Sequence, residues 1–348
     1  MEKLNTLVIF GGASNEYEVS LRSVITILEN IDREKFNPIL VGITKDGRWY
    51  LCDENLDSIK NDTWMKNGRR AFLTPDRQHK GLIVLDNNAK YVPVDLAFLA
   101  VHGQNCEDGS LQGLLKLARI PFIGAGVASS AVCFDKEFTH IIAERAFVPM
   151  AKWIKVDSSM SYQDILTDVK FNIGFPAFIK PANSGSSVGT APIMNENDLK
   201  AALENAFLHD RKAIIEEHIK GHEVECAVMG NRDDINAYET GEIVSLTGFY
   251  DYDSKYKNDS AKLLMPADIS PKLQERVKEL AVKAYRALDC RGYARVDFFV
   301  TEHDEVIFNE INTLPGFTSI SMWPQMMCRS GYDMKSLITK LLELAMEV

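Results

Sequence analysis

The sequence has few cysteines, and none of the six lies in a CxxC pair. Zinc sites and disulfide frameworks depend on close cysteine spacing, so this pattern predicts neither and fits a reducing compartment. No run approaches the roughly 18 apolar residues of a membrane-spanning helix. The N-terminal residues also lack a signal-peptide cleavage region. We therefore expect a cytoplasmic protein with no membrane partner.

The chain also lacks an excess of positive charge. Its net charge is −10, which argues against a general nucleic-acid-binding surface. An anionic substrate would therefore need a locally basic pocket. The 348 residues, 46% apolar and 25% charged, are typical of a soluble globular protein with two or three domains.

The most informative stretch lies near the C-terminus. Two apolar runs, Val296–Val300 and Val306–Ile311, flank the polar turn Thr301–Glu305, which predicts a β-hairpin. Side chains alternate between the two faces of a strand. One face is therefore expected to hold four polar side chains and the other to fill a core. The polar set is Arg295, Asp297, Glu310 and Asn312, and the core set is Val296, Phe298, Ile307 and Ile311.

The polar face of this hairpin has oxygen ligands and neither histidine nor cysteine. Such a set suits Mg²⁺, which binds through one or two carboxylates together with substrate phosphates. The alternative is a solvated face with an ordinary ion pair. The turn that follows, Thr313–Gly316, favours a functional site.

The N-terminus reads as the opening βα unit of a doubly wound fold. A strand at Leu7–Phe10 leads through Gly11-Gly12 into a helix from Glu18 to Ile31. Ligands bind where such a strand ends and its helix begins. Glu16 lies in this turn, either as a surface acid near the helix N-terminus or as a carboxylate for a substrate ammonium.

His102 follows the apolar strand Val94–Val101, with Glu107 close behind it. A histidine at a strand end can orient a carboxylate or be oriented by one, although a lone histidine is more often structural. Further on, Val127 to Ala146 predicts one helix with Lys136 on its polar side, and Asn197 is the expected N-cap of the helix ending at Phe207.

A second informative stretch follows the strand that carries Lys180. The small-residue loop Ala182–Thr190 leads into another strand, which excludes a phosphate-binding loop that opens a helix. A Gly/Ser loop with free N–H groups still makes a phosphate cover or a flexible lid. The alternative is a plain hairpin turn.

Two more segments have the composition of ligand-binding loops. The linker from Glu216 to Glu223 is acidic and suits an adenine edge and ribose hydroxyls, although exposed turns are often acidic too. Gly248 to Leu263 is a long polar loop with three tyrosines. Long loops in compact domains tend to be functional or disordered, and tyrosines argue against disorder. We expect a lid, with Lys255 binding phosphate and Tyr256 donating hydrogen bonds.

Taken together, these stretches resemble the D-alanine–D-alanine ligases of the ATP-grasp superfamily. The matching segments, in order, are ASNEYEVSL, AVHGQNCEDGSLQG, FIKPANSGSSVG, YDYDSKY, RVDFF and FNEINTLPGFTSISM. The resemblance implies an α/β and α+β ATP-grasp fold with an N-terminal doubly wound α/β domain. Its expected divisions are an N-terminal domain 1–124, a central ATP-grasp subdomain 125–215, and a C-terminal subdomain 216–348 with the metal site and lid.

The resemblance also implies roles for individual residues. Glu16 would hold the ammonium of the first D-alanine, with Ser186 and Tyr256 as its hydrogen-bonded partners and His102 nearby. Arg295 and the Gly316 amide would form an oxyanion site. Nucleotide-binding residues would be Lys136, Lys180, Glu216, Glu217, Ile219, Glu223 and Lys255. The second substrate would meet Ser321 and Met322, and the metal ligands would be Asp297, Glu310 and Asn312.

The implied reaction joins two D-alanines, with ATP and Mg²⁺ or Mn²⁺, through a D-alanyl phosphate, for peptidoglycan synthesis. The family also suggests a homodimer formed through the N-terminal domain. Tyr256 and the apolar Met322 favour D-alanine as the second substrate over D-serine or D-lactate, which resistance-type ligases use. Two rival functions are an ATP-grasp ligase acting on a larger acid and a non-enzymatic ATP sensor.

Overall fold

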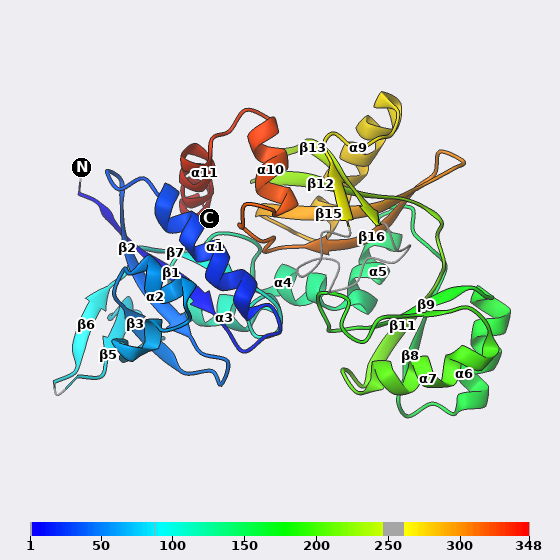
Figure 1. Cartoon of the computed structure of the whole chain (residues 1–348), viewed down its shortest axis with the longest axis horizontal. Helices are drawn as coiled ribbons and strands as arrows, with labels where there is room; N and C mark the ends of the chain where they lie inside the picture. The colour runs from blue at the N-terminus through cyan, green and yellow to red at the C-terminus, as the bar shows by residue number, and fades with distance from the viewer. Residues whose placement is uncertain (1, 87, 246–260, 348) are drawn as a thin grey trace.

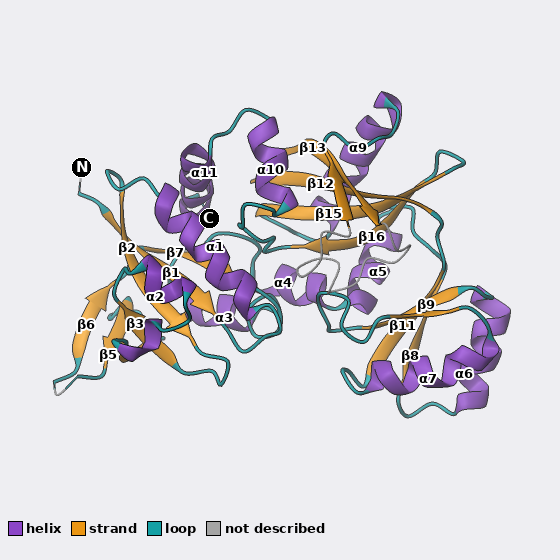
Figure 2. Ribbon diagram, viewed as in Figure 1, coloured by secondary structure: helices purple, strands orange, loops and turns teal. Residues whose placement is uncertain are grey.

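The computed structural model describes residues 2–86, 88–245 and 261–347. Its strands form three separate sheets, which follow one another along the chain (Figure 1). Helices lie against each sheet and between them (Figure 2). Within the described residues, no helix has the length and apolar character that crossing a membrane requires.

The N-terminal sheet has the strand order β6-β5-β4-β3-β2-β1-β7. Its strands are β1 (Leu4–Gly11), β2 (Phe36–Ile43), β3 (Trp49–Cys52), β4 (Arg69–Leu73), β5 (Gly81–Val84), β6 (Lys90–Pro93) and β7 (Leu96–Val101). Only β2, β1 and β7 pair in parallel, so the sheet is mixed rather than parallel throughout. The predicted βα unit is confirmed: α1 (Tyr17–Asn30) follows β1, with Gly11 and Gly12 in the left-handed region.

The central sheet is antiparallel, in the order β10-β9-β11-β8. It contains β8 (Trp153–Asp157), β9 (Ala177–Pro181), β10 (Ala191–Ile193) and β11 (Lys212–Glu217). The amphipathic helices α6 (Tyr162–Asp168) and α7 (Glu196–Phe207) share an apolar cluster with it. Asn195, and not Asn197, caps α7, because its side chain accepts from the Asn197 N–H while its own N–H donates to Asp198.

The third sheet has the order β14-β13-β12-β15-β16. Its strands are β12 (Gly221–Asn231), β13 (Asp234–Ser245), β14 (Ala261–Leu264), β15 (Gly292–Thr301) and β16 (Val306–Asn312). The helix α9 (Pro271–Ala287) buries Val277, Leu280 and Ala281 against this sheet. Ser270 caps α9 as its Ser-Pro start predicts, accepting from the Leu273 N–H.

The β15–β16 hairpin confirms the predicted polar face, but one core residue was predicted wrongly. Asp297 pairs with Glu310, and Phe298 pairs with Phe308, so Asn309 is an extra residue in the ladder. This bulge reverses the alternation beyond it. Val306 and Phe308 are therefore buried in the core, while Ile307 is half-exposed on the other face.

The predicted helix from Val127 to Ala146 is broken into α4 (Val127–Phe134) and α5 (Lys136–Arg145). Asp135 between them has an extended backbone, and its side chain accepts from the N–H groups of Glu137 and Phe138. Asparagine and aspartate compete with the helix backbone in this way and act as N-caps. The break makes Lys136 the first residue of a new helix.

The C-terminal helix packs against the N-terminal sheet. The stripe Leu337, Ile338, Leu341 and Leu342 of α11 (Met334–Met346) is buried in the cluster that contains β1 and β7. The described residues also form α2 (Leu56–Lys60), α3 (Ser110–Leu117), α10 (Met322–Arg329) and the short helices η1 (Trp64–Lys66) and η2 (Val169–Ile173). The division at residues 124 and 215 remains a prediction, with the three sheets spanning 4–101, 153–217 and 221–312.

Candidate active site

Two adjoining cavities lie along the inner faces of the sheets. The larger, of about 390 Å³, lies between the central and third sheets, and the smaller, of about 270 Å³, reaches the turn between β1 and α1. Both are lined by Lys136, Ser186, Arg295 and Glu310. These shared residues make the two cavities parts of one site.

The hairpin supplies the charged wall between the cavities. Arg295 is mostly buried and binds Asp297 through two nitrogens, Nε at 2.8 Å and Nη2 at 2.7 Å. Its Nε also lies 3.1 Å from Glu225. Burial lowers the pKa of Arg295, but the carboxylates of Asp297 and Glu225 outweigh it and hold that pKa well above its ordinary value.

The metal ligands that the sequence predicted lie on this wall. Asp297 and Glu310 face each other across the β15–β16 ladder, and Asn312 pairs with Arg295 one step further along. No group of three His, Cys, Asp or Glu side chains with metal-site geometry occurs in the described residues. The set is two carboxylates and one amide, which fits a hard cation that completes its shell with phosphate oxygens and water.

Lys180 reaches the same wall from the central sheet. Its Nζ lies 2.6 Å from a Glu216 oxygen and donates to Asn309 at 2.8 Å. The other Glu216 oxygen is 2.5 Å from Nε2 of His140. Burial raises the pKa of Glu216, but the Lys180 charge and His140 outweigh it and lower the pKa to about 2.

The opposite end of the larger cavity suits a flat ring. Phe178 and His218 lie with ring centroids 5.2 Å apart, tilted by 47°. Glu217, Ile219 and Glu223 line the same cavity. The acidic linker predicted to meet a nucleotide base and ribose therefore borders an aromatic wall.

The smaller cavity begins at the β1–α1 turn. Ser186 donates a hydrogen bond to Glu16 at 2.7 Å. This bond joins the loop Ala182–Thr190, called the serine loop below, to the N-terminal domain. His102 Nδ1 lies 2.9 Å from the Leu314 carbonyl and 3.8 Å from Glu107. Burial lowers the pKa of His102, but hydrogen bonding to Glu107 and the negative charge of Glu16 outweigh it and raise that pKa. The carboxylates of Glu16 and Glu107 therefore favour positive charge at this end of the cavity.

The far wall of the smaller cavity comes from the segment after the hairpin. A Cβ on Gly316 would lie 2.9 Å from Ser321 Oγ, so a side chain at this position would displace the serine hydroxyl. Ser321 Oγ accepts from the Thr318 N–H at 3.0 Å. Met322 is buried against the same cavity.

Comparisons with known proteins identify the family that this arrangement belongs to. A family model described as "D-ala D-ala ligase C-terminus" matches residues 142–343, and one described as "D-ala D-ala ligase N-terminus" matches residues 5–125. D-alanine–D-alanine ligase from Caldicellulosiruptor bescii is 42% identical and covers 100% of this chain and 96% of its own. The chain belongs to the D-alanine–D-alanine ligase family. It is therefore an ATP-dependent ligase of peptidoglycan synthesis.

Further relatives and solved structures agree. D-alanine–D-alanine ligase A from Escherichia coli K12 is 42% identical over 100% of this chain and 97% of its own. The VanG D-Ala:D-Ser ligase from Enterococcus faecalis superposes with a TM-score of 0.92 at 39% identity, covering 99% of this chain and 100% of that one. The D-alanine–D-alanine ligase from Coxiella burnetii superposes with a TM-score of 0.86 at 32% sequence identity. The match covers 99% of this chain and 96% of that one. The predicted ATP-grasp fold is confirmed.

Every described residue that the sequence placed in the ligase site lines one of the two cavities. Lys255 and Tyr256, like most of the proposed lid, lie outside the described residues. Sequence reasoning missed Glu225, Asn309 and His140. Glu225 could have been found, since it alternates with Glu223 along one strand. Asn309 depends on the bulge and His140 on a tertiary contact, for which the sequence carries no signal.

Glu216 supports a test of pH dependence. Its pKa falls from an ordinary 4.5 to about 2 in the folded ligase, so the stability it contributes is present above pH 4.5 and lost as the pH falls toward 2. The full contribution is about 3 kcal/mol. Urea unfolding of the wild type and Glu216→Gln should therefore differ most above pH 5 and converge only as the pH approaches 2. The exposed Glu204→Gln is the control, and a difference that grows on acidification would contradict the assignment.

Proposed function

We propose that this ligase joins two D-alanines to D-alanyl-D-alanine through a D-alanyl phosphate. A carboxylate oxygen of the first D-alanine attacks the γ-phosphorus of ATP, and ADP leaves. The amine of the second D-alanine then attacks the acyl carbon, and inorganic phosphate leaves with the loss of one proton from nitrogen. The observation that carries the proposal is that the larger cavity, which Lys180 lines, and the smaller cavity, which Glu16 lines, share Arg295 and Glu310.

The first step needs the phosphate and the carboxylate held together. Phosphoryl transfer is catalysed mainly by positioning and by charge on the transferring group. We assign Lys136 and Lys180 to the phosphates, with the base and ribose beside Glu216, Glu217, Ile219 and Glu223. Asp297, Glu310 and Asn312 would hold Mg²⁺ or Mn²⁺, which supplies further positive charge when bound. Glu16 would receive the ammonium of the first D-alanine, oriented by Ser186 and His102.

The second step develops negative charge on the acyl oxygen. Arg295 and the Gly316 N–H are the donors for that oxygen, and preorganised donors of this kind are the strongest stabilisers of an oxyanion. Ser321 and Met322 would receive the second D-alanine. By family resemblance, Lys255 would bind phosphate and Tyr256 would join the Glu16–Ser186 pair. These two, outside the described residues, would help to exclude water from the acyl phosphate.

The second candidate function is ligation of D-alanine to D-serine. It is favoured by the structural likeness to the VanG D-Ala:D-Ser ligase. Against it, Met322 is apolar and offers no donor to a serine hydroxyl. We therefore keep D-alanine as the second substrate, with rejection of D-serine limited to about 100-fold, because an apolar pocket excludes an added hydroxyl poorly.

A competition assay decides between these substrates. The ligase is given ATP, Mg²⁺ and equal concentrations of D-alanine, D-serine and D-lactate near neutral pH, and the products are identified by mass. D-alanyl-D-alanine should dominate. A mixed product with D-serine or D-lactate as the main species would place the chain with the resistance-type ligases. Absence of phosphate release with any D-amino acid, alongside release with a larger acid, would overturn the proposed function itself.

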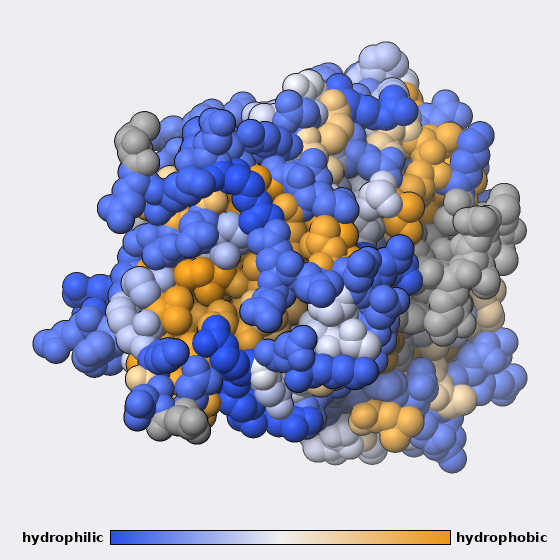
Figure 3. Space-filling model, turned by 60° about the vertical axis from the view of Figure 1, so that its left-hand side comes forward, coloured by the Kyte–Doolittle hydropathy of each residue, from blue (hydrophilic) through white to orange (hydrophobic). Residues whose placement is uncertain are grey.

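We also propose that the ligase acts in the cytoplasm as a homodimer formed through its N-terminal domain. Figure 3 brings that part of the molecule forward and shows apolar surface gathered on it. Phe72, Leu85 and Tyr91, on or next to the strands β4–β6, are among the exposed large hydrophobic side chains. Exposed apolar patches often mark interaction surfaces. Sedimentation of the wild type against Phe72→Lys tests this, and an unchanged monomer in both would contradict it.

A further inference from the structure

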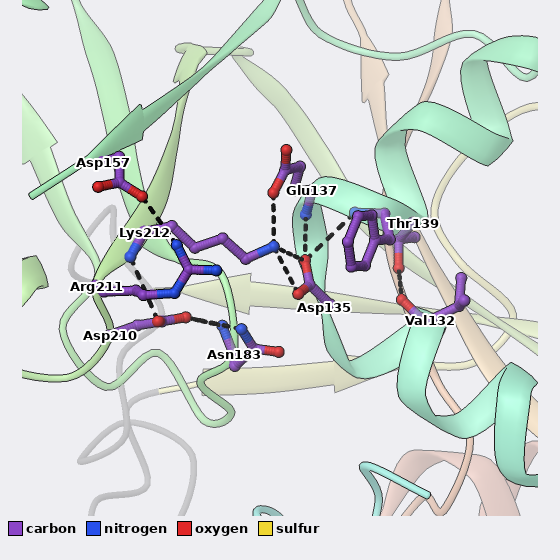
Figure 4. A network of polar contacts seen from close by, with 10 residues as sticks. Val132, Asp135, Glu137, Thr139, Asp157, Asn183, Asp210, Arg211 and Lys212 are labelled. Carbon is purple, nitrogen blue, oxygen red and sulfur yellow. Dashed lines mark hydrogen bonds and ion pairs between the residues drawn. The ribbon is translucent and has the colours of Figure 1, made fainter. Parts of the chain in front are cut away.

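One buried ion pair lies outside both cavities and is not needed for contact with any substrate. Lys212, at the start of β11, is 5% exposed. Its Nζ lies 2.7 Å from Asp135 and 2.6 Å from Glu137 (Figure 4). The same ammonium group lies 4.3 Å from the ring centroid of Phe138. The cation therefore holds the first turn of α5.

This turn carries Lys136, which lines both cavities. The Lys136 N–H donates to the Ala182 carbonyl at 2.9 Å, and the Ala182 N–H donates to the Lys212 carbonyl at 3.0 Å. Lys136 Nζ then donates to the Ser184 carbonyl at 2.6 Å. The side chain and backbone of Lys212 thus join the helix, the end of β9 and the start of the serine loop into one closed network.

The nearby residue Asp210 extends this network to the base of the serine loop. Its carboxylate accepts from both the backbone and side-chain nitrogens of Asn183, at 2.9 and 2.8 Å, and from the Lys212 N–H at 3.3 Å (Figure 4). Beyond Asn183 the loop turns through Ser186 and Ser187, both in the left-handed region. The base of the loop is therefore fixed where its tip reaches Glu16.

Stability alone does not explain a charge in this place. Burying an ammonium and two carboxylates has a desolvation cost that close pairing only partly offsets, and apolar replacements of such clusters are often neutral or stabilising. A charged cluster does, however, fix one geometry, because Nζ satisfies its three donors only when α5 and β11 are held in register. The network is therefore better suited to positioning than to stability.

We propose that Lys212 is a positioning residue for nucleotide binding, which sets Lys136 and the serine loop against the phosphates of ATP. The inference rests on the phosphate role proposed for Lys136 but not on the identity of the amino-acid substrates. Removing the cation frees the first turn of α5, so that Lys136 samples orientations that do not bind phosphate. Displacements of about 1 Å at such a group cost about 100-fold in rate.

The test compares Lys212→Met and Lys212→Arg with the wild type. Calorimetry of ATP and Mg²⁺ binding without any amino acid should show affinity reduced by about 10- to 100-fold in Lys212→Met, as for other groups that orient a binding side chain. Lys212→Arg, which keeps the charge, should recover most of the loss. The matched control is Arg211→Met, because the neighbouring Arg211 pairs with Asp157 at the surface and should leave affinity unchanged.

A double-mutant cycle separates positioning from general support of the fold. If Lys212 acts mainly through Lys136, then Lys212→Met should weaken ATP binding strongly in the wild type but much less in a Lys136→Met background, where only its effect on the serine loop remains. Equal losses in both backgrounds, or wild-type affinity in Lys212→Met, would overturn the proposal. If Lys212→Met does not fold, Glu137→Gln replaces it in the same cycle, since it keeps the Asp135 pair, and the same outcomes decide.

This design also keeps the inference distinct from the proposed function. Failure of the proposed function would appear as wild-type protein that binds ATP but does not form D-alanyl-D-alanine. Failure of the inference would appear as ATP affinity that does not depend on Lys212 through Lys136, whatever the product.

Discussion

Glu310→Gln is expected to lower phosphate release by at least about 1,000-fold at saturating ATP and D-alanine, while the variant stays folded. The substitution keeps the size of the side chain but removes one of the two carboxylates that face each other across the β15–β16 ladder. Charge on the transferring phosphoryl group is worth several kcal/mol, and the neutral amide is a much weaker ligand for a hard cation. Continuous phosphate release and thermal unfolding measure the two effects separately.

The same hairpin offers a matched control. Glu305 lies in the exposed turn at its far end, so Glu305→Gln makes the same chemical change away from both cavities. It should leave turnover unchanged. Turnover in Glu310→Gln within tenfold of the wild type would show that the hairpin carboxylates do not form the metal site. If they do form it, raising the Mg²⁺ or Mn²⁺ concentration should recover part of the activity of the variant.

Arg295→Met is expected to have the second large effect, on both catalysis and stability. The guanidinium binds two largely buried carboxylates, those of Glu225 and Asp297. Removing one partner of a buried ion pair costs about 3–5 kcal/mol, because the remaining charges stay desolvated. Loss of an oxyanion donor adds a decrease of about 100- to 1,000-fold in turnover. Urea unfolding and single-turnover product formation measure the two losses.

The sign of the pH dependence makes this test specific. In Arg295→Met, burial and mutual repulsion are expected to raise the pKa values of the Glu225 and Asp297 carboxyls. Protonation of these groups as the pH falls then removes the repulsion between them. The stability deficit of Arg295→Met should therefore shrink between pH 7 and pH 5. The surface variant Arg276→Met, which breaks the exposed pair with Glu279, should show no deficit at either pH. A deficit that stays constant with pH would mean that lost packing, not charge, is responsible.

Several features of the site followed directly from local sequence. The alternation of Arg295 with Asp297 and of Glu310 with Asn312 depends only on the two-residue period of a strand, and the structure confirms one polar face. Glu16 in the turn after β1 likewise depends on local chain geometry. Glu225 was within reach of the same argument, because it shares a face of β12 with Glu223.

Other features required the tertiary structure. The Asn309 bulge is a property of how two strands pair, so the sequence of one strand could not show it or correct the placement of Ile307. The break at Asp135 was visible as an N-cap residue, but helical periodicity on both sides obscured it. The contact between His140 and Glu216 joins residues 76 positions apart.

The sequence by itself determined the family, the strand–turn–helix start and the residue types that line the two cavities, because these depend on local patterns and on motifs in a fixed order. Only the tertiary structure decided which charges pair, since Arg295 could meet Asp297 alone or Glu225 as well, depending on how β12 lies against β15. It also decided that the Lys212 ammonium group pairs with Asp135 and Glu137, on either side of Lys136. Ion pairs between distant segments form only once packing has excluded water from both partners, and no local pattern carries that information.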